Sequence, residues 1–216
     1  MIAPEGYSTL ATVFIVSAVI AWGGSYLGSA ASWVVYGLLM LTFLLFVYFF
    51  RDPERSIPDN HDLIVAPADG KVVRIQKVRD ERYLHGEGTQ ISIFLSPLDV
   101  HVNRVPVSGK LEYVEYFPGK FLMAWEDHAS EQNERAHFGV RHPSGYKILF
   151  KQITGFMARR IVYHIREGDE LKAGQRFGIM KFSSRMDLVL PPDIELRVQE
   201  GDRTVAGESI IGEIGP

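Results

Sequence analysis

Two adjacent serines interrupt an apolar stretch near the C-terminal end of the chain. Ser183 and Ser184 stand between an apolar run at 177–182 and a second at 186–190. Both flanks have the composition of buried strands, so hydroxyl groups between them must be hydrogen-bonded or used in chemistry. One interpretation is a polar strand end. The other is that the Oγ of Ser184 is a nucleophile aimed at its own backbone.

A histidine and an aspartate elsewhere in the chain are the natural partners of such a nucleophile. His101 lies in the polar cluster 99–104, which follows an apolar strand, and Asp69 lies in a tight turn. In an activated serine the imidazole takes the hydroxyl proton and a carboxylate orients the imidazole. Each residue also has a structural interpretation, as a satisfied histidine and as a turn aspartate bonded to its own backbone.

The remaining histidines give no comparable pattern. His61, His85, His137 and His142 lie among charged or turn residues and are expected at the surface, and His164 alternates within a strand. No pair has the spacing of a helical zinc motif, so no metal site is predicted. The chain has no cysteine, which excludes disulfides and thiolate chemistry.

The charge is unevenly distributed over the 216 residues. The net charge of −3 gives no indication of nucleic-acid binding. Residues 6–50 contain no charged residue. We therefore expect a membrane-associated helical hairpin over 1–50, with apolar segments at 9–22 and 31–50 and a turn at 23–29. A cleaved signal peptide is the alternative, but it would need a basic start.

The flanking charges predict the orientation of the hairpin. Arg51 and Arg55 follow the second segment directly, and basic flanks stay on the cytoplasmic side. Both termini and the rest of the chain are therefore expected at the cytoplasmic face of the cell membrane.

The chain after the hairpin is predicted to be mainly β. A linker at 51–60 contains two prolines and leads into a β-rich domain at 61–216, in which 121–135 reads as a solvated loop. The predicted strands are short, β-branched and bounded by Gly, Pro or Asp, at 63–65, 71–75, 91–95, 147–150 and 160–165.

An internal repeat refines the fold class. Residues 167–179 recur as 200–212, each with a Gly-Asp turn, a short strand and an Ala-Gly turn. With residues 66–73 this resembles the barrel-sandwich hybrid of biotinyl and lipoyl carriers, so we expect a barrel-sandwich-hybrid-like α+β domain. Met180-Lys181 resembles the Met-Lys pair on which those carriers bear biotin. In the carriers the modified lysine lies before the Gly-Asp and Gly-Gln turns, whereas Lys181 lies after both. Biotin carriage thus stays an alternative, with the repeat as scaffold.

The chain carries five ordered motifs, at residues 66–70, 95–104, 129–135, 152–160 and 181–187. Together they resemble a known family, the short, archaeal-type form of pyruvoyl-dependent phosphatidylserine decarboxylase. The resemblance runs from about Arg51 to the C-terminus.

The resemblance implies an enzyme that makes its own cofactor. The serine matching Ser184 attacks the preceding carbonyl, the peptide becomes an ester, and β-elimination breaks the chain. Ser184 then carries a covalent pyruvoyl group, and chains 1–183 and 184–216 remain associated. The pyruvoyl carbonyl serves as the electron sink when phosphatidylserine loses carbon dioxide to give phosphatidylethanolamine.

The same resemblance assigns roles to Asp69 and His101. Asp69 would orient an imidazole, and His101 would be the base in processing or the proton donor in decarboxylation. Longer bacterial relatives carry a second histidine where this chain has Arg104. Either His101 serves both steps or a distant histidine such as His128 contributes.

The cleavage bond departs from the family pattern. The family places Gly before the reactive serine, and this chain has Ser183. Glycine leaves the carbonyl open to attack and permits backbone angles that a Cβ disfavours. We therefore expect the chain as given to be an unprocessed precursor; a Ser-Ser variant that matures slowly is the alternative.

A lipid substrate also gives the hairpin a purpose, since the active site must reach the bilayer. Residues 116–125 are candidates for a lipid-facing lip, and Arg159 and Arg160 for attracting the substrate's anionic groups; core packing and surface pairing are their ordinary interpretations. A homo-oligomer is left open. Two other functions remain: a serine hydrolase using the same three residues, which lacks a Gly-x-Ser-x-Gly elbow, and a non-catalytic membrane-anchored adaptor.

Overall fold

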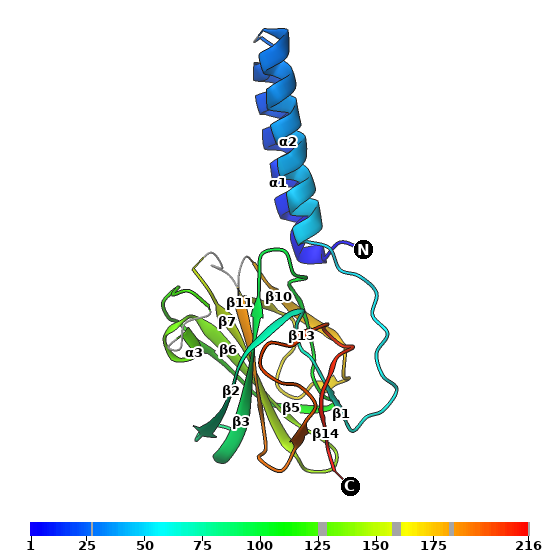
Figure 1. The fold of residues 1–216 in the computed structure, drawn as a ribbon, viewed down its shortest axis with the longest axis vertical. Helices are drawn as coiled ribbons and strands as arrows, with labels where there is room; N and C mark the ends of the chain where they lie inside the picture. The colour runs from blue at the N-terminus through cyan, green and yellow to red at the C-terminus, as the bar shows by residue number, and fades with distance from the viewer. Residues whose placement is uncertain (27, 125–128, 157–160, 182–183, 216) are drawn as a thin grey trace. The chain divides into compact units, whose positions relative to one another are not determined.

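The computed structural model describes residues 1–26, 28–124, 129–156, 161–181 and 184–215 of the chain. Within them the chain forms two compact units, Met1–Glu54 and Arg55–Pro216. The first unit is helical and the second consists mainly of β-strands (Figure 1). The predicted fold class, mainly β with a helical hairpin ahead of it, is confirmed.

The N-terminal unit is a pair of apolar helices. After a 3-10 turn, η1 (Pro4–Gly6), helix α1 spans Tyr7–Gly24 and helix α2 spans Ser29–Phe49. By length and composition alone, both are long and apolar enough to cross a membrane. Helix α1 is longer than the expected 9–22 at both ends. It begins at Tyr7, and it continues through Gly23 and Gly24, which the sequence analysis assigned to the turn.

Hydrogen bonds fasten the hairpin at both ends. At the turn, the Ser32 hydroxyl donates to the carbonyl of Gly24 (2.8 Å). At the open end, the amide of Ala3 donates to the carbonyl of Phe50 (2.8 Å), and the amide of Asp52 donates to that of Met1 (2.7 Å). The two helices are therefore joined where their terminal backbone groups would otherwise lack partners.

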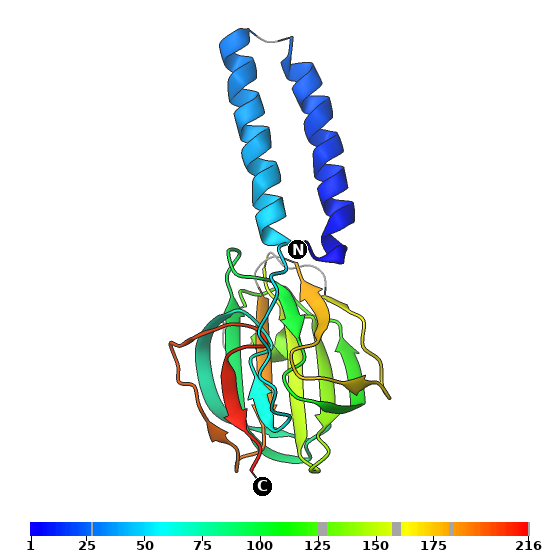
Figure 2. The same cartoon turned by 90° about the vertical axis from the view of Figure 1, so that its right-hand side faces the viewer.

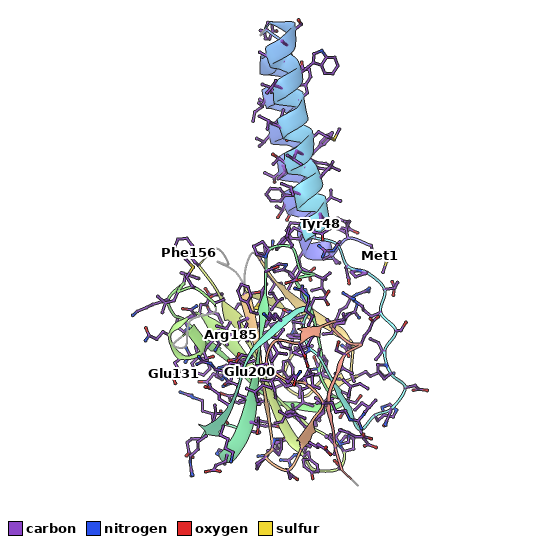
Figure 3. The ribbon with its side chains drawn as sticks, viewed as in Figure 1. Met1, Tyr48, Glu131, Phe156, Arg185 and Glu200 are labelled. Carbon is purple, nitrogen blue, oxygen red and sulfur yellow. The ribbon has the colours of Figure 1, made fainter. Side chains whose placement is uncertain are left out.

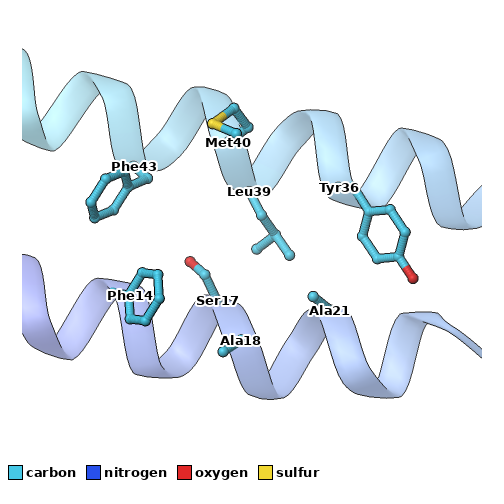
Figure 4. Close-up of a pocket in the computed structure, with 8 residues that line it drawn as sticks. All are labelled: Phe14, Ser17, Ala18, Ala21, Tyr36, Leu39, Met40 and Phe43. Atoms are coloured by element: carbon cyan, nitrogen blue, oxygen red, sulfur yellow. The ribbon is translucent and has the colours of Figure 1, made fainter.

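The facing surfaces of the helices are complementary in size (Figure 4). Small residues of α1, among them Ala18 and Ala21, face larger side chains of α2 such as Leu39 across a shallow apolar groove. Phe14 meets Phe43 edge to face, with ring centroids 6.1 Å apart. Small residues opposite large ones are typical of helix pairs packed in a membrane.

Aromatic side chains mark both ends of the hairpin. Trp22, Tyr26 and Trp33 flank the turn, and Tyr7 and Tyr48 lie at the opposite end. All five are exposed. Aromatic residues at the two ends of apolar helices are the pattern of a membrane interface.

The second unit contains one large and two small antiparallel sheets. The large sheet curls on itself and has the strand order β13-β2-β3-β11-β7-β6-β5-β9 (Figure 2). Its strands are β2 (Gly70–Asp80), β3 (Gly86–Leu95), β5 (Gly109–Phe117), β6 (Arg135–Arg141), β7 (Lys147–Thr154), β9 (Glu170–Leu171), β11 (Ser184–Leu190) and β13 (Arg203–Thr204).

The small sheets have three strands each and the orders β1-β14-β12 and β4-β10-β8. Their strands are β1 (Leu63–Val65), β4 (Val102–Arg104), β8 (Ile161–Tyr163), β10 (Arg176–Met180), β12 (Glu195–Leu196) and β14 (Ile210–Glu213). A short helix, α3 (Ala129–Gln132), lies within the segment that was expected to be a loop.

Three aromatic rings form the centre of the core. Phe138 of β6 and Phe150 of β7 stack with centroids 5.2 Å apart, and Phe177 of β10 meets both edge to face at 5.3 and 5.2 Å. All three are buried. Because β10 belongs to a small sheet, this triangle joins it to the concave face of the large one.

The sequence repeat is a structural repeat. The φ angles of equivalent glycines nearly agree between the two copies. They are 96° at Gly168 and 99° at Gly201, and 76° at Gly174 and 78° at Gly207. These left-handed conformations favour glycine. The first copy is anchored on β5, where the carboxylate of Glu167 accepts from the amide of Val114 (2.9 Å).

The second copy makes the same contacts on β2. The carboxylate of Glu200 accepts from the amide of Ile75 (2.6 Å), and the amide of Val72 donates to the carbonyl of Asp202 (2.8 Å), as the amide of Leu111 donates to that of Asp169 (2.9 Å) in the first copy. The large sheet is therefore built from two related halves, with β13 and β9 at its outer edges.

The close approach of β10 to β8 generates a prediction. A Cβ on Gly178 would lie 2.2 Å from the carbonyl oxygen of Val162, whereas a Cβ on Gly86 would have no atom nearer than 4.0 Å. We expect Gly178→Ala to lower the free energy of unfolding by about 1–3 kcal/mol, since the two backbones must separate. Gly86→Ala is the matched control and should be close to neutral. Thermal unfolding of both variants in detergent measures the difference; equal melting temperatures would contradict the prediction.

Candidate functional site

Ser184 begins the central strand of the large sheet. It lies opposite Leu95, the last residue of β3, and opposite Thr154, the last residue of β7. The residue is fully buried, and its Oγ has no hydrogen-bond partner among the described residues. A buried hydroxyl without a partner is costly, which favours a chemical use for it.

His101 lies at the same end of the molecule. It is fully buried and directly precedes β4, and its carbonyl accepts from the amide of Met180 (3.4 Å), the last residue of β10. The chain runs from Met180 to Ser184 through only three residues, so His101 and Ser184 lie at the common end of their two sheets.

The backbone sets the proton arrangement of this imidazole. The Nδ1 of His101 is 2.9 Å from the carbonyl oxygen of Asp99. A carbonyl only accepts hydrogen bonds, so Nδ1 carries the proton in this arrangement and Nε2 carries the lone pair. That tautomer is the one needed for a base acting through Nε2.

Asp69 lies at this end too, two strands away from Ser184. It directly precedes β2, whose first residues lie beside the end of β3. Its carboxylate accepts two bonds from the guanidinium of Arg55 (2.9 and 2.8 Å) and one from the amide of Ala206 (2.8 Å). The structure thus brings the three predicted residues to one end of the fold, with Asp69 bonded to Arg55 and His101 to the backbone of Asp99.

Two buried amides complete the concave side of the site. The Nε2 of Gln152 on β7 donates to the Oδ1 of Asn103 on β4 (2.9 Å), and both residues are fully buried. The sequence analysis noted Asn103 only as part of a polar cluster and did not single out Gln152. The available signal was an amide at position 152, on the same face of the strand as the apolar residues Ile148 and Phe150.

Charged residues occupy the opposite face of β11. The buried guanidinium of Arg185 bonds the buried carboxylate of Asp187 (2.9 Å) and donates to the carbonyl of Ala124 (3.3 Å). Asp187 also accepts from the Ser130 hydroxyl. In Figure 3, Arg185 lies in the interior of the unit and Glu131, next to Ser130, at its periphery. The pair therefore fixes the start of β11 from behind.

The buried side chain of Asn133 fixes the segment that precedes β6. The side chain of Asn133 accepts from the amide of Leu122 (2.9 Å) and donates to the carbonyls of Leu122 (2.9 Å) and Thr154 (2.8 Å). Since Thr154 lies opposite Ser184, these hydrogen bonds join the segment before β6 to the end of the sheet where Ser184 lies.

Over the part of the chain that the structure describes, no three His, Asp or Glu side chains are arranged to hold a metal ion.

The chain was compared with known proteins. The family model of phosphatidylserine decarboxylase matches residues 42–212. A phosphatidylserine decarboxylase proenzyme of Salinibacter ruber is 57% identical over 176 residues, which cover 81% of this chain and 77% of the relative. That of Pelodictyon phaeoclathratiforme is 42% identical over 211 residues, 98% of this chain and 99% of the relative. The chain belongs to the phosphatidylserine decarboxylase family.

Several residues of interest lie outside the described part of this decarboxylase-family chain: Phe182, Ser183, Trp125, His128, Arg159 and Arg160. In the predicted lip, Tyr116 and Phe121 are exposed while Ala124 is buried. Exposed apolar side chains also follow the two strands that flank Ser184. Leu98 follows β3, and Phe156, which is labelled in Figure 3, follows β7.

Two histidines that were expected at the surface are buried. His142 is bonded to the Ser144 hydroxyl (2.6 Å) and to the carbonyl of His61 (3.2 Å). His137 packs on Phe117 with ring centroids 4.6 Å apart, and neither ring nitrogen has a partner among the described residues. The expectation was wrong because each ring lies against another part of the fold: His137 against Phe117 of β5, and His142 against the backbone of His61. His164 follows β8 and is exposed.

Burial makes His137 a determinant of acid stability. Burial, and then the nearby charge of Lys151, lowers the pKa of His137 to about 2. Unfolded histidine takes up a proton below about pH 6.5, while the native residue stays neutral. The unfolding free energy should therefore fall by about 1.4 kcal/mol per pH unit on acidification below that value through this residue alone.

Replacing His137 tests this dependence. We expect His137→Leu to remove that part of the slope between about pH 6 and pH 4, measured by denaturant unfolding of the full chain in detergent. The two curves should run parallel above about pH 7.5. Equal slopes at acid pH would contradict the prediction.

Proposed function

We propose that the chain is the proenzyme of a phosphatidylserine decarboxylase that makes phosphatidylethanolamine with a pyruvoyl group formed from Ser184. Membership of the family, whose relatives are named as proenzymes, supports the reaction and the self-processing. The observation that carries the assignment to Ser184 is its fully buried Oγ, without a partner among the described residues, at the head of a central strand and at the end where His101 lies.

His101 is the base in this proposal. The backbone of Asp99 holds its Nδ1 proton, so the Nε2 lone pair is the one that takes the proton of the Ser184 hydroxyl. Asp69 is a positioning residue at the same end, where it ties Arg55 and the turn at Ala206 to the start of β2. The direct orienting contact on the imidazole comes from the Asp99 carbonyl.

The residues present fit a pyruvoyl group at position 184. Such a group supplies an electrophilic ketone that accepts the electrons left when carbon dioxide departs. Thr154 and Leu95 hold the position on both sides within the ladders, and burial keeps bulk water away from it. His101, at the same end, is then available to deliver a proton to the decarboxylated carbon.

Cleavage before Ser184 leaves the fold intact in this proposal. The small chain, 184–216, contains β11, which is paired on one side with β3 and on the other with β7 over nearly its whole length. Neither ladder includes the broken bond, so the two chains stay associated.

The site works on a membrane lipid, and we propose that the hairpin keeps it there. Two uncharged helices with aromatic residues at both ends support membrane association. Arg51 and Arg55 directly after them support a catalytic unit on the cytoplasmic side.

Ser183 makes the chain as given a precursor that matures slowly or not at all. A Cβ at the residue whose carbonyl is attacked crowds the approach of Oγ and restricts the backbone angles that the attack needs.

The first experiment compares this chain with Ser183→Gly by intact mass. We expect the Gly variant to split into 1–183 and 184–216, the smaller lighter than its plain peptide by one ammonia, and the chain as given to stay whole. Ser183→Gly/Ser184→Ala is the matched control and should not split. If the Gly variant stays whole while folded, self-processing is refuted, and the serine hydrolase, which keeps its chain, becomes the better assignment.

A second experiment tests His101. In the Ser183→Gly background, His101→Gln should slow chain cleavage by on the order of 10²–10⁴-fold, because the hydroxyl loses its base. Gel densitometry over time measures the rate. His164→Gln, which changes an exposed histidine, is the control and should cleave at the parent rate. Unchanged cleavage in His101→Gln would remove the residue from the processing step.

A further inference from the structure

We propose that Asn103 is a further catalytic residue of self-cleavage, whose side-chain N–H stabilises the negative charge that develops on the attacked carbonyl oxygen, and that Gln152 is the positioning residue that aims it. This inference rests on the proposed self-processing at Ser184. It assigns a use to two buried amides that the reaction has not so far involved.

The first support is an incomplete set of hydrogen bonds. Gln152 Nε2 donates to Asn103 Oδ1 (2.9 Å), but Asn103 Nδ2 and Gln152 Oε1 have no partner among the described residues. Both side chains are fully buried. Native proteins rarely leave buried amide groups unpaired, and those they leave call for an explanation. Exchanging O and N in both amides would leave the same complement, one donor and one acceptor.

The second support is position on the large sheet. Ser184 lies opposite Thr154, and Met186 lies opposite Gln152. Side chains two residues apart on a strand, and those directly opposite across an antiparallel pair, point to the same face. Ser184 and Gln152 are therefore diagonal neighbours on the concave face.

The small sheet repeats this spacing. Asn103 lies opposite Gly178, and the backbone of His101, two residues earlier, bonds that of Met180, two residues later. The Asn103–Gln152 hydrogen bond thus joins the two sheets. It lies two residues further along the strands than the end where His101 and Ser184 lie. The four residues are therefore buried neighbours at one end of the two sheets.

The chemistry of the attack needs such a donor. The Oγ of Ser184 bonds to the carbonyl carbon of residue 183 and gives its proton to Nε2 of His101, which leaves a negative charge on the carbonyl oxygen. The C–N bond then breaks, the Ser184 nitrogen takes the proton, and an ester remains. A fixed N–H donor in a site without water stabilises this oxyanion strongly.

Gln152 decides which end of Asn103 is offered. Because the Nε2 of Gln152 donates to the Asn103 oxygen, the Asn103 nitrogen is the end of that amide left to donate to another group. A donor bonded in this way is also polarised by its neighbour, which strengthens the bond it gives.

The test uses the full chain in detergent, in the Ser183→Gly background. Asn103→Asp keeps the shape of the side chain and can still accept from Gln152, but it has no N–H to give. We expect its cleavage to be slower than the parent by on the order of 10²–10³-fold. Gln90→Met is the matched control: it removes another buried amide of the same sheet, on the convex face, and should cleave at the parent rate.

Hydroxylamine separates the attack from the later elimination, because it cleaves an accumulated ester. If Asn103 acts in the attack, Asn103→Asp should release no fragment with hydroxylamine. Fragment release would place its role after the ester and overturn the oxyanion assignment. Parent-rate cleavage would also overturn it and leave the pair as a structural contact. If the Ser183→Gly parent itself does not cleave, the proposed function has failed instead.

A double-mutant cycle tests the role of Gln152. Gln152→Met should slow cleavage less than Asn103→Asp, and the double variant should be no slower than Asn103→Asp alone, since Gln152 acts through Asn103. A purely structural residue would lower the melting temperature and leave the rate unchanged while the protein is folded. Additive effects on the rate would refute the assignment to Gln152.

Discussion

The antiparallel pairing of β11 on both its sides determines how Ser184 is held. Seven residues, Ser184–Leu190, form a strand that lies between β3 and β7, so the first residue of the strand is fixed by its neighbours on two sides. The concave face of this strand contributes apolar side chains to the core, and its convex face carries Arg185 and Asp187. A serine in this position has little freedom, which is the condition for an attack on an adjacent carbonyl.

The internal repeat explains how the sheet around this strand is built. Each copy of the repeat adds a short edge strand and a carboxylate contact, one to β2 and the other to β5. The Ala-Gly turns of the two copies meet at Ile57, whose side chain fills the space that a Cβ on Gly174 or Gly207 would need. Strand β11 therefore lies in a frame that is nearly symmetric, while Ser184, His101 and Asp69 belong to neither copy.

The parts of the structure that depend on local sequence were predictable. The absence of charge over 6–50 indicated the helices, and the Gly-Asp and Ala-Gly pairs indicated turns that do have left-handed glycines. Residue types made Ser184, His101 and Asp69 candidates, and the motifs that resemble the decarboxylase family assigned their roles, which stay predictions. Contacts between distant segments were not predictable: Gln152 and Asn103 are 49 residues apart and on different sheets, and Arg55 reaches Asp69 from the linker. His137 was misjudged for the same reason, because the ring that it packs on, Phe117, lies on the neighbouring strand β5.

The proposed cleavage at the head of β11 would also make folding irreversible in practice. The uncut chain can unfold and refold as one molecule, with β11 always tethered to its neighbours. After the cut, unfolding frees a strand of the central sheet as a separate chain, and refolding becomes a second-order process that depends on concentration. The mature protein would then persist by the height of its unfolding barrier rather than by its ability to refold. If the hairpin holds the larger chain in a membrane, as proposed, the loss of the smaller chain would be effectively permanent.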